Sequence, residues 1–545
     1  MDPQPATSKG TSKNWVKTLG IVFIVILILT AIAAVGYFIV KNIQQEESKS
    51  KVTTELSRDS ITIGKNTAPL GVFPNSSPEL QDMEFNNNIF DGLTRTINGK
   101  VSPALAKSWT NPDKTTWRFY LREGAKFHNG DPFTAADVKF SIDQALDPKN
   151  EWPDAFSVGT VESVSVVKVN DYTVDIKTTK PDPVLLSRLV SIYIVSEKQY
   201  KSKKPQDPAV GTGPYKFVSL DDKTGILEAN SSYYLGDPKV KRIVYKYFPE
   251  EATEDDLVAA LKKGEVDLIS LRTKPQDSSL ASDFQIKSLY TASTSWLYLD
   301  ATRQKSPYVD KTPNPLTNKL VRQAIYKAID LNQIIKEVGL SAEPASQLVA
   351  ETVFGYNPNI TRPKRSVEEA KNLLKEAGME AGFTFTLDTP ATSEKIGNVI
   401  ADNLKDINIT VKVNLVTKEI GLPKMLKGDS SAFILGNSSD TLDSGDIFSA
   451  GLHTPTEDFG GDNLLAYSNP ELDKLAEEAS SIFKPKERLP KLQEAMAKAM
   501  EELPIIPLYN LKQIFIIRNN FDWTPTAQGL IYCNEITGRE VTTSK

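Results

Sequence analysis

The chain contains very little cysteine and histidine. Its 545 residues include one cysteine, Cys533, and two histidines, His128 and His453. One cysteine excludes an intramolecular disulfide. So few sulfur and imidazole groups also leave almost no material for a zinc site, a c-type haem or a Cys–His nucleophile pair. We therefore expect a protein without a metal ion or a cofactor.

The chain also lacks an excess of positive charge. Lysine and arginine total 64 against 69 aspartate and glutamate residues, which gives a net charge of -5. Nucleic-acid binding depends on basic residues that release counterions, so a nucleic-acid partner is not expected. Hydrophobic residues make up 40% and charged residues 24% of the chain. These values are typical of a globular protein and exclude global disorder, a fibrous repeat and a polytopic membrane protein.

Catalytic motifs are missing as well. The sequence contains no HExxH, Walker A or GxSxG pattern. Residues 211–213 read GTG, but Pro214 follows and a third glycine is absent, so a turn is favoured over a phosphate cradle. His128 lies in the turn-rich stretch KFHNGDPF, where a structural histidine with Asp131 as a candidate contact is favoured over a catalytic base. The sequence predicts a protein that is not an enzyme.

Three aspartates form a short acidic pattern near the C-terminal part of the chain. Asp440, Asp443 and Asp446 recur at three-residue intervals beside Gly445. A calcium loop places its ligands at alternate residues and ends in a distal glutamate, and neither feature is present. The pattern therefore only loosely resembles a calcium site.

One long apolar run interrupts this otherwise soluble composition. Residues 19–40 carry no charge and as a helix would reach about 33 Å, enough to cross a hydrocarbon core of about 30 Å. Trp15 and Tyr37 lie near its ends, where aromatic rings favour the headgroup region. A cleaved secretory signal with residues 31–33 as its cleavage site is the alternative, although the apolar run continues through Val40.

The membrane segment predicts the organisation of the N-terminal part. We expect residues 1–18 to be a short cytoplasmic tail, residues 19–40 a transmembrane anchor and residues 41–57 a polar stalk. The large domain that follows is then extracytoplasmic and attached to the cell membrane by a single pass. Charge near the two ends of the segment does not itself decide this orientation.

Helix and strand signals alternate from residue 60 onward, which predicts an α/β protein with mixed sheets. Residues 116–122 (TWRFYLR) alternate between apolar and polar side chains as a half-buried strand does. Thr134 and Thr253, each with an aspartate three positions later, predict capping boxes at the start of two helices. Ser468 with Glu471 predicts a further helix start.

A series of segments occurs in a characteristic order along the chain. They are residues 104–143 (which include KFHNGDPF), 211–217 (GTGPYKF), 227–250, 321–330 (VRQAIYKAID), 368–378 (EEAKNLLKEAG), 467–479 (YSNPELDKLAEEA) and 504–510 (PIIPLYN). Together they resemble the extracytoplasmic solute-binding proteins of the oligopeptide/dipeptide/nickel class, family 5, which serve ABC importers. The resemblance spans nearly all of residues 61–523.

The resemblance implies a periplasmic-binding-protein-like fold of two lobes that close over a ligand, with an additional domain inserted in the first lobe. The expected boundaries are residues 58–99, 207–291 and 503–541 for lobe I, residues 100–206 for the additional domain and residues 292–502 for lobe II. The chain crossings near Thr291 and Glu502 are then expected to act as hinges, and ligand binding to favour the closed state.

The resemblance also implies a ligand site. In peptide-binding members an aspartate holds the amino terminus of the peptide, and Asp440 occupies the matching position in SSDTLDSGDIF. Thr441 and Ser444 replace the family's usual tyrosine and proline, so a solvated acidic loop remains the alternative. Trp296 and Tyr298 match a strand whose side chains often line the cleft, with ordinary sheet core as the alternative.

These observations predict the membrane-anchored binding component of an ABC importer, a monomer that captures peptides and delivers them to a permease. A receptor that senses a peptide without transport is one alternative. The same fold could instead bind a sugar or a metal chelate, although His453 alone is thin support for metal recognition. An extracellular hydrolase is a third possibility, which incubation with peptides would test.

Overall fold

The computed structural model describes residues 59–539, apart from residues 73, 75–78, 98, 148, 150–163, 203–208, 250, 276 and 278. The chain divides into the units Met1–Ser57 and Arg58–Lys545, and everything described below belongs to the second. The predicted tail, transmembrane anchor and stalk lie outside the described residues. Among the helices that are described, none combines the length and the apolar character that crossing a bilayer requires.

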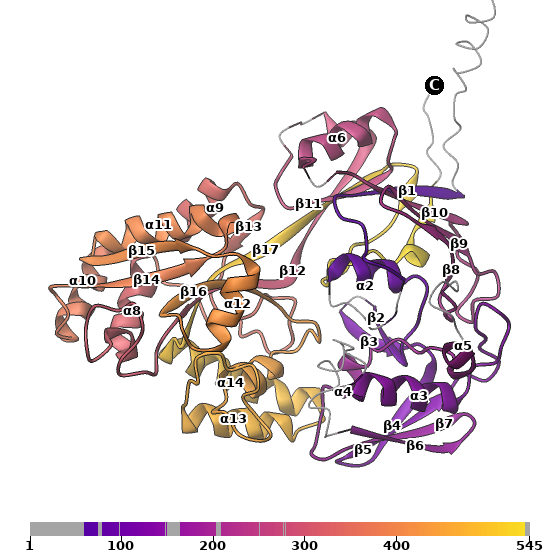
Figure 1. Ribbon diagram of the computed structural model, residues 1–545, viewed down its shortest axis with the longest axis horizontal. Helices are drawn as coiled ribbons and strands as arrows, with labels where there is room; N and C mark the ends of the chain where they lie inside the picture. The colour runs from indigo at the N-terminus through magenta and orange to yellow at the C-terminus, as the bar shows by residue number, and fades with distance from the viewer. Residues whose placement is uncertain are drawn as a thin grey trace, which may run out of the picture. The chain divides into compact units, whose positions relative to one another are not determined.

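A large mixed sheet runs through the described unit (Figure 1). Its strand order is β15-β14-β16-β12-β17-β11-β1-β10-β9-β8, with β13 paired to β17 beside this path. The strands are β1 (Ser60–Lys65), β8 (Tyr215–Leu220), β9 (Thr224–Ala229), β10 (Arg242–Tyr247), β11 (Leu268–Leu271), β12 (Phe284–Leu299), β13 (Ala342–Pro344), β14 (Phe383–Thr389), β15 (Ile409–Leu415), β16 (Ala432–Ser438) and β17 (Ile505–Arg518).

The two longest strands join the two halves of this sheet. β12 and β17 pair antiparallel from Phe284 opposite Arg518 to Tyr298 opposite Ile505. One part of β17 pairs with β11 and so continues toward β1, while one part of β12 pairs with β16 and so continues toward β14. Figure 1 shows β12 and β17 running between the two halves of the sheet. Their pairing register shifts between Tyr290 and Thr294 and again between Ser295 and Trp296, as at a β-bulge.

A separate four-stranded antiparallel sheet carries its own core. Its order is β4 (Ala106–Asp113), β5 (Thr116–Leu121), β7 (Thr173–Thr178) and β6 (Val164–Asn170). The fully buried Phe119, Val138 and Ile142 belong to one apolar cluster, which joins the sheet to helix α3 (Ala135–Leu146). The predicted strand at residues 116–122 is thereby confirmed. Two short ribbons, β2 (Thr94–Ile97) with β3 (Lys100–Pro103) and β18 (Phe521–Asp522) with β19 (Thr537–Gly538), complete the described sheets.

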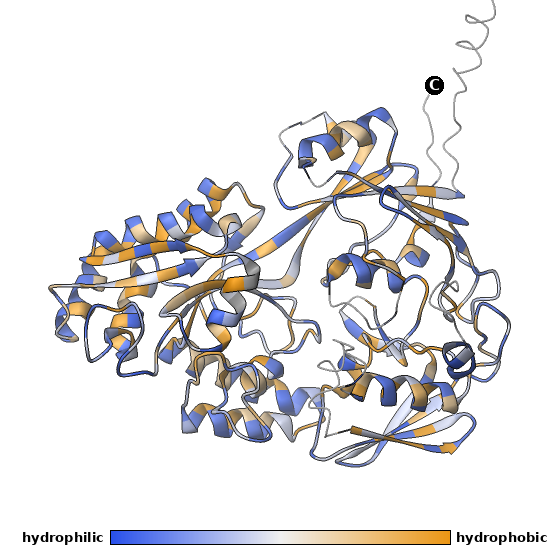
Figure 2. Ribbon diagram, in the orientation of Figure 1, coloured by the Kyte–Doolittle hydropathy of each residue, from blue (hydrophilic) through white to orange (hydrophobic). Residues whose placement is uncertain are grey.

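The helices cover the sheets with their apolar faces. The longer ones are α2 (Leu80–Asn86), α3, α6 (Glu254–Lys263), α8 (Lys319–Ala328), α9 (Leu331–Val338), α10 (Val367–Glu376), α11 (Glu394–Lys405), α12 (Lys418–Leu426), α13 (Pro470–Ser480) and α14 (Pro485–Glu502). Hydrophilic and hydrophobic colours alternate along α10 and α11 in Figure 2, as amphipathic helices require. Buried residues of α8, α10 and α11 share one core with strands β14 and β15.

Two of the three predicted helix starts are confirmed. Thr134 and Asp137 form a reciprocal capping box on α3, and Thr253 with Asp256 forms another on α6. The third prediction is wrong by one residue, because Asn469 rather than Ser468 caps α13, accepting from the amide of Glu471 at 3.0 Å. Proline occupies the first helical position, where its fixed φ places the cap on the residue directly before it.

Candidate ligand-binding site

An acidic loop, residues 439–446, follows strand β16 and leads into a π-helix, η6 (Ile447–Leu452). The Ser439 amide donates to the Ala292 carbonyl at 3.0 Å, which fixes the start of the loop on β12. The Ser444 amide donates to the Phe354 carbonyl at 2.8 Å near its end. The loop is therefore held at both ends by backbone hydrogen bonds to distant segments.

The three aspartates of the acidic loop have different surroundings. Asp443 pairs with Arg488 of α14 at 2.5 Å. Asp446 pairs with Arg188 at 2.5 Å and also accepts a hydrogen bond from the Thr441 hydroxyl. Asp440 makes no side-chain hydrogen bond or ion pair with any residue that the structure describes. The loop thus presents one uncompensated carboxylate.

The carboxylate of Asp440 is accessible to solvent, but it is partly desolvated and lies near other negative charges. Its side chain is exposed, yet desolvation by surrounding protein raises its pKa, and the negative charge of Asp446 raises it further. Asp182 contributes a fourth carboxylate, which pairs with Arg188 at 2.9 Å. The cluster therefore has more carboxylates than guanidinium groups, and this excess of negative charge favours a cationic ligand group.

Strand β16 has an incomplete edge next to this loop. On one side it pairs with β12 along its whole length, from Ala432 opposite Leu299 to Ser438 opposite Ser293. On the other side β14 pairs with it at a single position, where Asp388 lies opposite Phe433. Beyond that position, no strand in the described part of the chain pairs with β16 on this side.

The pairing of β16 with β12 determines which backbone N–H and C=O groups of β16 point toward its unpaired side. Because the Ser439 amide bonds to β12, alternate residues back along β16 also direct their backbone groups to β12. The backbone groups of Gly436 and Ser438 therefore point to the unpaired side. Both residues are exposed, and a Cβ atom placed on Gly436 would meet no atom within 4 Å. The face of the sheet is therefore open at Gly436, and no described strand pairs with this part of the β16 edge.

Trp296 and Tyr298 lie on the same face of β12, and both are buried. The Trp296 indole nitrogen donates to the Leu348 carbonyl at 3.0 Å, and the ring meets Tyr298 edge-on at 5.8 Å. Tyr298 stacks on Phe433 with ring centroids 4.4 Å apart. Both aromatic side chains therefore pack inside an apolar cluster of the protein, and the structure places neither beside Asp440 through a contact.

The motifs at His128 and at residues 211–213 form one structural contact. The Gly211 amide donates to His128 Nδ1 at 3.3 Å, and His128 Nε2 lies 3.0 Å from the Gly213 carbonyl oxygen. These contacts are consistent with a neutral ring that carries its proton on Nε2. Asp131 instead bonds to Asn129, so the predicted contact between His128 and Asp131 is wrong. The turn interpretation of the GTG segment fits this packing.

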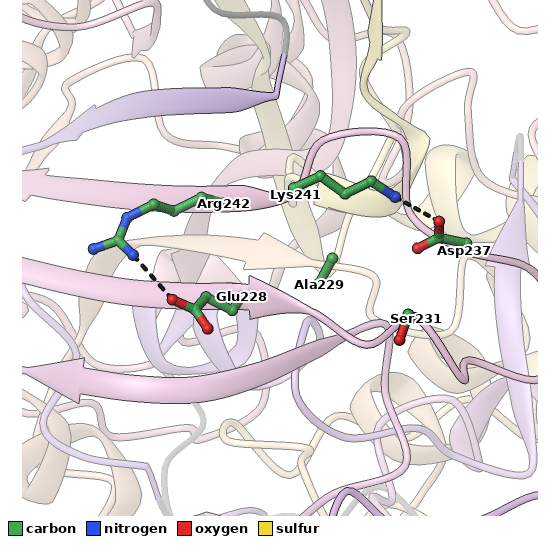
Figure 3. Close-up of a pocket in the computed structure, with 6 residues that line it drawn as sticks. All are labelled: Glu228, Ala229, Ser231, Asp237, Lys241 and Arg242. Atoms are coloured by element: carbon green, nitrogen blue, oxygen red, sulfur yellow. Dashed lines mark hydrogen bonds and ion pairs between the residues drawn. The ribbon is translucent and has the colours of Figure 1, made fainter.

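A hollow lies on the β9–β10 side of the large sheet (Figure 3). Its charged side chains pair with one another, Glu228 with Arg242 at 3.0 Å and Asp237 with Lys241 at 2.5 Å. Figure 3 shows these pairs lying on either side of Ala229. Because its charges are already compensated, this hollow offers a ligand less than the acidic loop does.

Sequence reasoning missed Arg188 and Arg488, which neutralise two of the three aspartates. Arg188 is the last residue of a short helix, α4 (Leu185–Arg188), and lies 258 positions from Asp446. The acidic pattern marks Asp446, but no local pattern marks its partner, because Arg188 is so far away in the sequence. Only the folded chain brings them together.

Comparison with known proteins gives a consistent result. The sequence profile described as bacterial extracellular solute-binding proteins, family 5 middle, matches residues 100–458. Heme-binding protein A of Haemophilus influenzae is 28% identical over 86% of this chain and 89% of that protein. The oligopeptide-binding protein OppA of Bacillus subtilis is 26% identical over 91% of this chain and 94% of that protein.

Solved structures share the fold. HbpA2 from Haemophilus parasuis superposes with a TM-score of 0.76 at 22% identity, covering 88% of this chain and 100% of that one. The periplasmic binding protein DppA from Helicobacter pylori, in complex with the peptide STSA, superposes with a TM-score of 0.71 at 23% identity. It covers 88% of this chain and 98% of that protein. The predicted α/β fold of a two-lobed binding protein is confirmed.

Proposed function

The chain belongs to the bacterial extracellular solute-binding proteins of family 5, and we propose that it captures peptides by holding their amino terminus at Asp440. The uncompensated carboxylate of Asp440, in a cluster with excess negative charge, is the observation that carries this proposal. A peptide ammonium supplies the missing positive charge and hydrogen-bond donors. Its backbone can then follow the free edge of β16.

The geometry of β16 gives the ligand a direction. Asp440 follows the C-terminal end of the strand, so a peptide anchored there and lying along Ser438 and Gly436 runs antiparallel to β16. Main-chain hydrogen bonds of this kind provide affinity without reading side chains. A binding protein of this design tolerates varied peptide sequences, while the ammonium sets the register.

The lobe boundaries and hinges expected from the family resemblance form part of the proposal. The crossings near Thr291 and Glu502 lie at β12 and at the start of β17, the strands that connect the two halves of the large sheet. A hinge in these strands lets one half of the sheet rotate toward the other when a ligand contacts both. Trp296 and Tyr298 would then support the site from the core beneath β12.

Haem is the alternative ligand to a peptide, because one relative is named a heme-binding protein. Both histidines of this chain already direct their two ring nitrogens at protein groups. His128 contacts Gly211 and Gly213, and His453 contacts the Thr454 carbonyl at 2.7 Å and Glu477 at 3.2 Å. A histidine ligand to haem iron would therefore have to give up one of these contacts, whereas a peptide ammonium meets the uncompensated Asp440 directly.

Asp440→Asn is expected to weaken peptide binding by about 10- to 150-fold, the equivalent of losing a charge-assisted hydrogen bond of about 1.5–3 kcal/mol. Calorimetric titration with a mixture of tri- to pentapeptides measures this loss. Asp429→Asn is the matched control, because it removes the same charge near the other end of β16. This control should bind peptides as the wild type does.

The same titration with amino-terminally acetylated peptides tests the role of the ammonium. Acetylation should weaken binding to the wild type and have little further effect on Asp440→Asn, since both changes remove one interaction. Equal binding of free and acetylated peptides would place the anchor elsewhere. Binding of haem with no binding of peptide would overturn the assignment of the ligand.

Attachment to the membrane and delivery to an ABC permease complete the proposed function. The uncharged residues 19–40 would keep the binding domain beside its permease. The intact mass of the protein purified from membranes should include residues 1–40. A mature chain that begins after residue 33 would show instead that this segment is a cleaved signal.

A further inference from the structure

Arg188 connects the acidic loop to a part of the chain that is remote in sequence. It ends helix α4, and its guanidinium reaches Asp182 at 2.9 Å and Asp446 at 2.5 Å. The helix itself is held firmly, because Leu185 and the following Leu189 are buried in the core of the four-stranded sheet. The guanidinium is therefore presented to the loop from a rigid support.

The effect of Arg188 extends to the neighbour of Asp440. One oxygen of Asp446 binds Arg188, and the other accepts from the hydroxyl of Thr441, the residue next to Asp440. Arg488 compensates Asp443 in the same way, at 2.5 Å. Without Arg188, the loop would carry two uncompensated carboxylates that repel each other.

We propose that Arg188 is a positioning residue for the ammonium site: by pairing with Asp446 it orders the loop through Thr441 and leaves Asp440 as the one carboxylate available to a ligand. This inference rests on the proposed function. It makes the segment of residues 182–188 part of the binding machinery, although that segment need not contact the ligand.

Charge determines the expected behaviour. The charged groups around Asp440 form a connected set. Asp440 is repelled by Asp446, which is also repelled by Asp443. Arg188 attracts Asp446 and Asp182, and Arg488 attracts Asp443. Removing the charge of Arg188 leaves Asp446 uncompensated, which disfavours the ionised form of Asp440. Peptide binding through an ionised Asp440 must then be lost at a higher pH as the solution is acidified.

A competing explanation treats Arg188 only as a clamp between distant segments. Lys180 provides the matched control, because it also spans such segments, pairing with Asp458 at 3.3 Å and lying 4.1 Å above the ring of Phe459. No contact links Lys180 to Asp446 or to Thr441. A clamp role predicts similar effects for both residues, whereas the positioning role concerns Arg188 alone.

The test is the pH dependence of peptide affinity in the full chain, measured from pH 4 to 8 with one tripeptide. Arg188→Gln should move the acid limb of binding upward by about one pH unit, and Asp446→Asn should move it downward. The double variant should return close to the wild type, and Arg188→Lys should retain the wild-type profile. Lys180→Gln should leave the acid limb in place.

Opposite shifts in the two single variants cannot arise from a general loss of folding, so they would support the inference. A wild-type pH profile in Arg188→Gln, with normal peptide affinity, would overturn it and leave the proposed function intact. Equal shifts in Arg188→Gln and Lys180→Gln would also overturn it. Absence of peptide binding by the wild type at every pH would overturn both the inference and the proposed function.

Discussion

Gly211→Ala is expected to lower the midpoint of thermal unfolding by roughly 3 °C, from a cost of about 3 kcal/mol in a unit of this size. A Cβ atom at this position would lie 2.0 Å from the carbonyl oxygen of Ile89 and 2.8 Å from the ring of Phe90. The obstructing atom belongs to backbone that cannot easily move, because the same Ile89 carbonyl accepts from the Gly213 amide at 2.9 Å. Differential scanning fluorimetry measures the shift.

Gly461→Ala is the matched control for this substitution. Gly461 is exposed, has no left-handed backbone conformation, and a Cβ atom there would meet nothing within 4 Å. Its midpoint should lie within about 1 °C of the wild type, since surface substitutions usually change stability by less than about 0.5 kcal/mol. An unchanged midpoint in Gly211→Ala would mean that the backbone near Ile89 yields, and the close-packing interpretation would be wrong.

Local features of the fold could be predicted from the sequence because their determinants lie within a few residues of one another. The capping boxes at Thr134 and Thr253 depend on an aspartate three positions later, so the pattern and the contact coincide. The strand at residues 116–122 was recognisable from its alternation for the same reason. At Ser468 the pattern misled by one residue, because Asn469 next to a proline makes a better cap.

The site was less predictable because its contacts join distant segments. Asp440 was identified through the family resemblance, and its role stays a prediction. The pairing of Arg188 with Asp446, and of His128 with Gly211 and Gly213, follows from the packing of separate sheets and helices. The family resemblance placed Trp296 and Tyr298 on a strand that often lines the cleft, with ordinary sheet core as the alternative, but it did not identify Phe433 as the residue on which Tyr298 stacks.

A second large effect is expected when the protein is acidified, because His128 is held neutral. Burial, with a smaller contribution from the nearby positive charge of Lys216, lowers its pKa from 6.5 to about 4. The lone pair on Nδ1 also accepts from Gly211, which requires that this nitrogen be unprotonated. A depressed histidine pKa means that the unfolded chain binds the proton more tightly, so acid favours unfolding.

The size of this loss of stability, and the pH range over which it occurs, follow from these pKa values. The contribution of neutral His128 is complete above pH 6.5 and is lost as the pH falls toward about 4. Between pH 7 and pH 5 the free energy of unfolding should decrease by about 2 kcal/mol from this residue alone. Asp91 acts in the opposite direction, because burial raises its pKa to about 6 and protonation then stabilises the folded state as the pH falls.

His128→Gln separates the two contributions. The glutamine amide can offer the same donor to Gly213 and the same acceptor to Gly211 without titrating, while Asp91 remains in both proteins. The free energy of unfolding is measured in urea at pH 7 and at pH 5, from the transition that includes this region. Its decrease from pH 7 to pH 5 should be larger in the wild type than in His128→Gln by about 2 kcal/mol. Equal losses in the two proteins would show that His128 gains its proton without disturbing the fold. The contact between His128 and the GTG segment would then contribute nothing to stability. The close approach of the Ile89 backbone would be the remaining reason for glycine at positions 211 and 213.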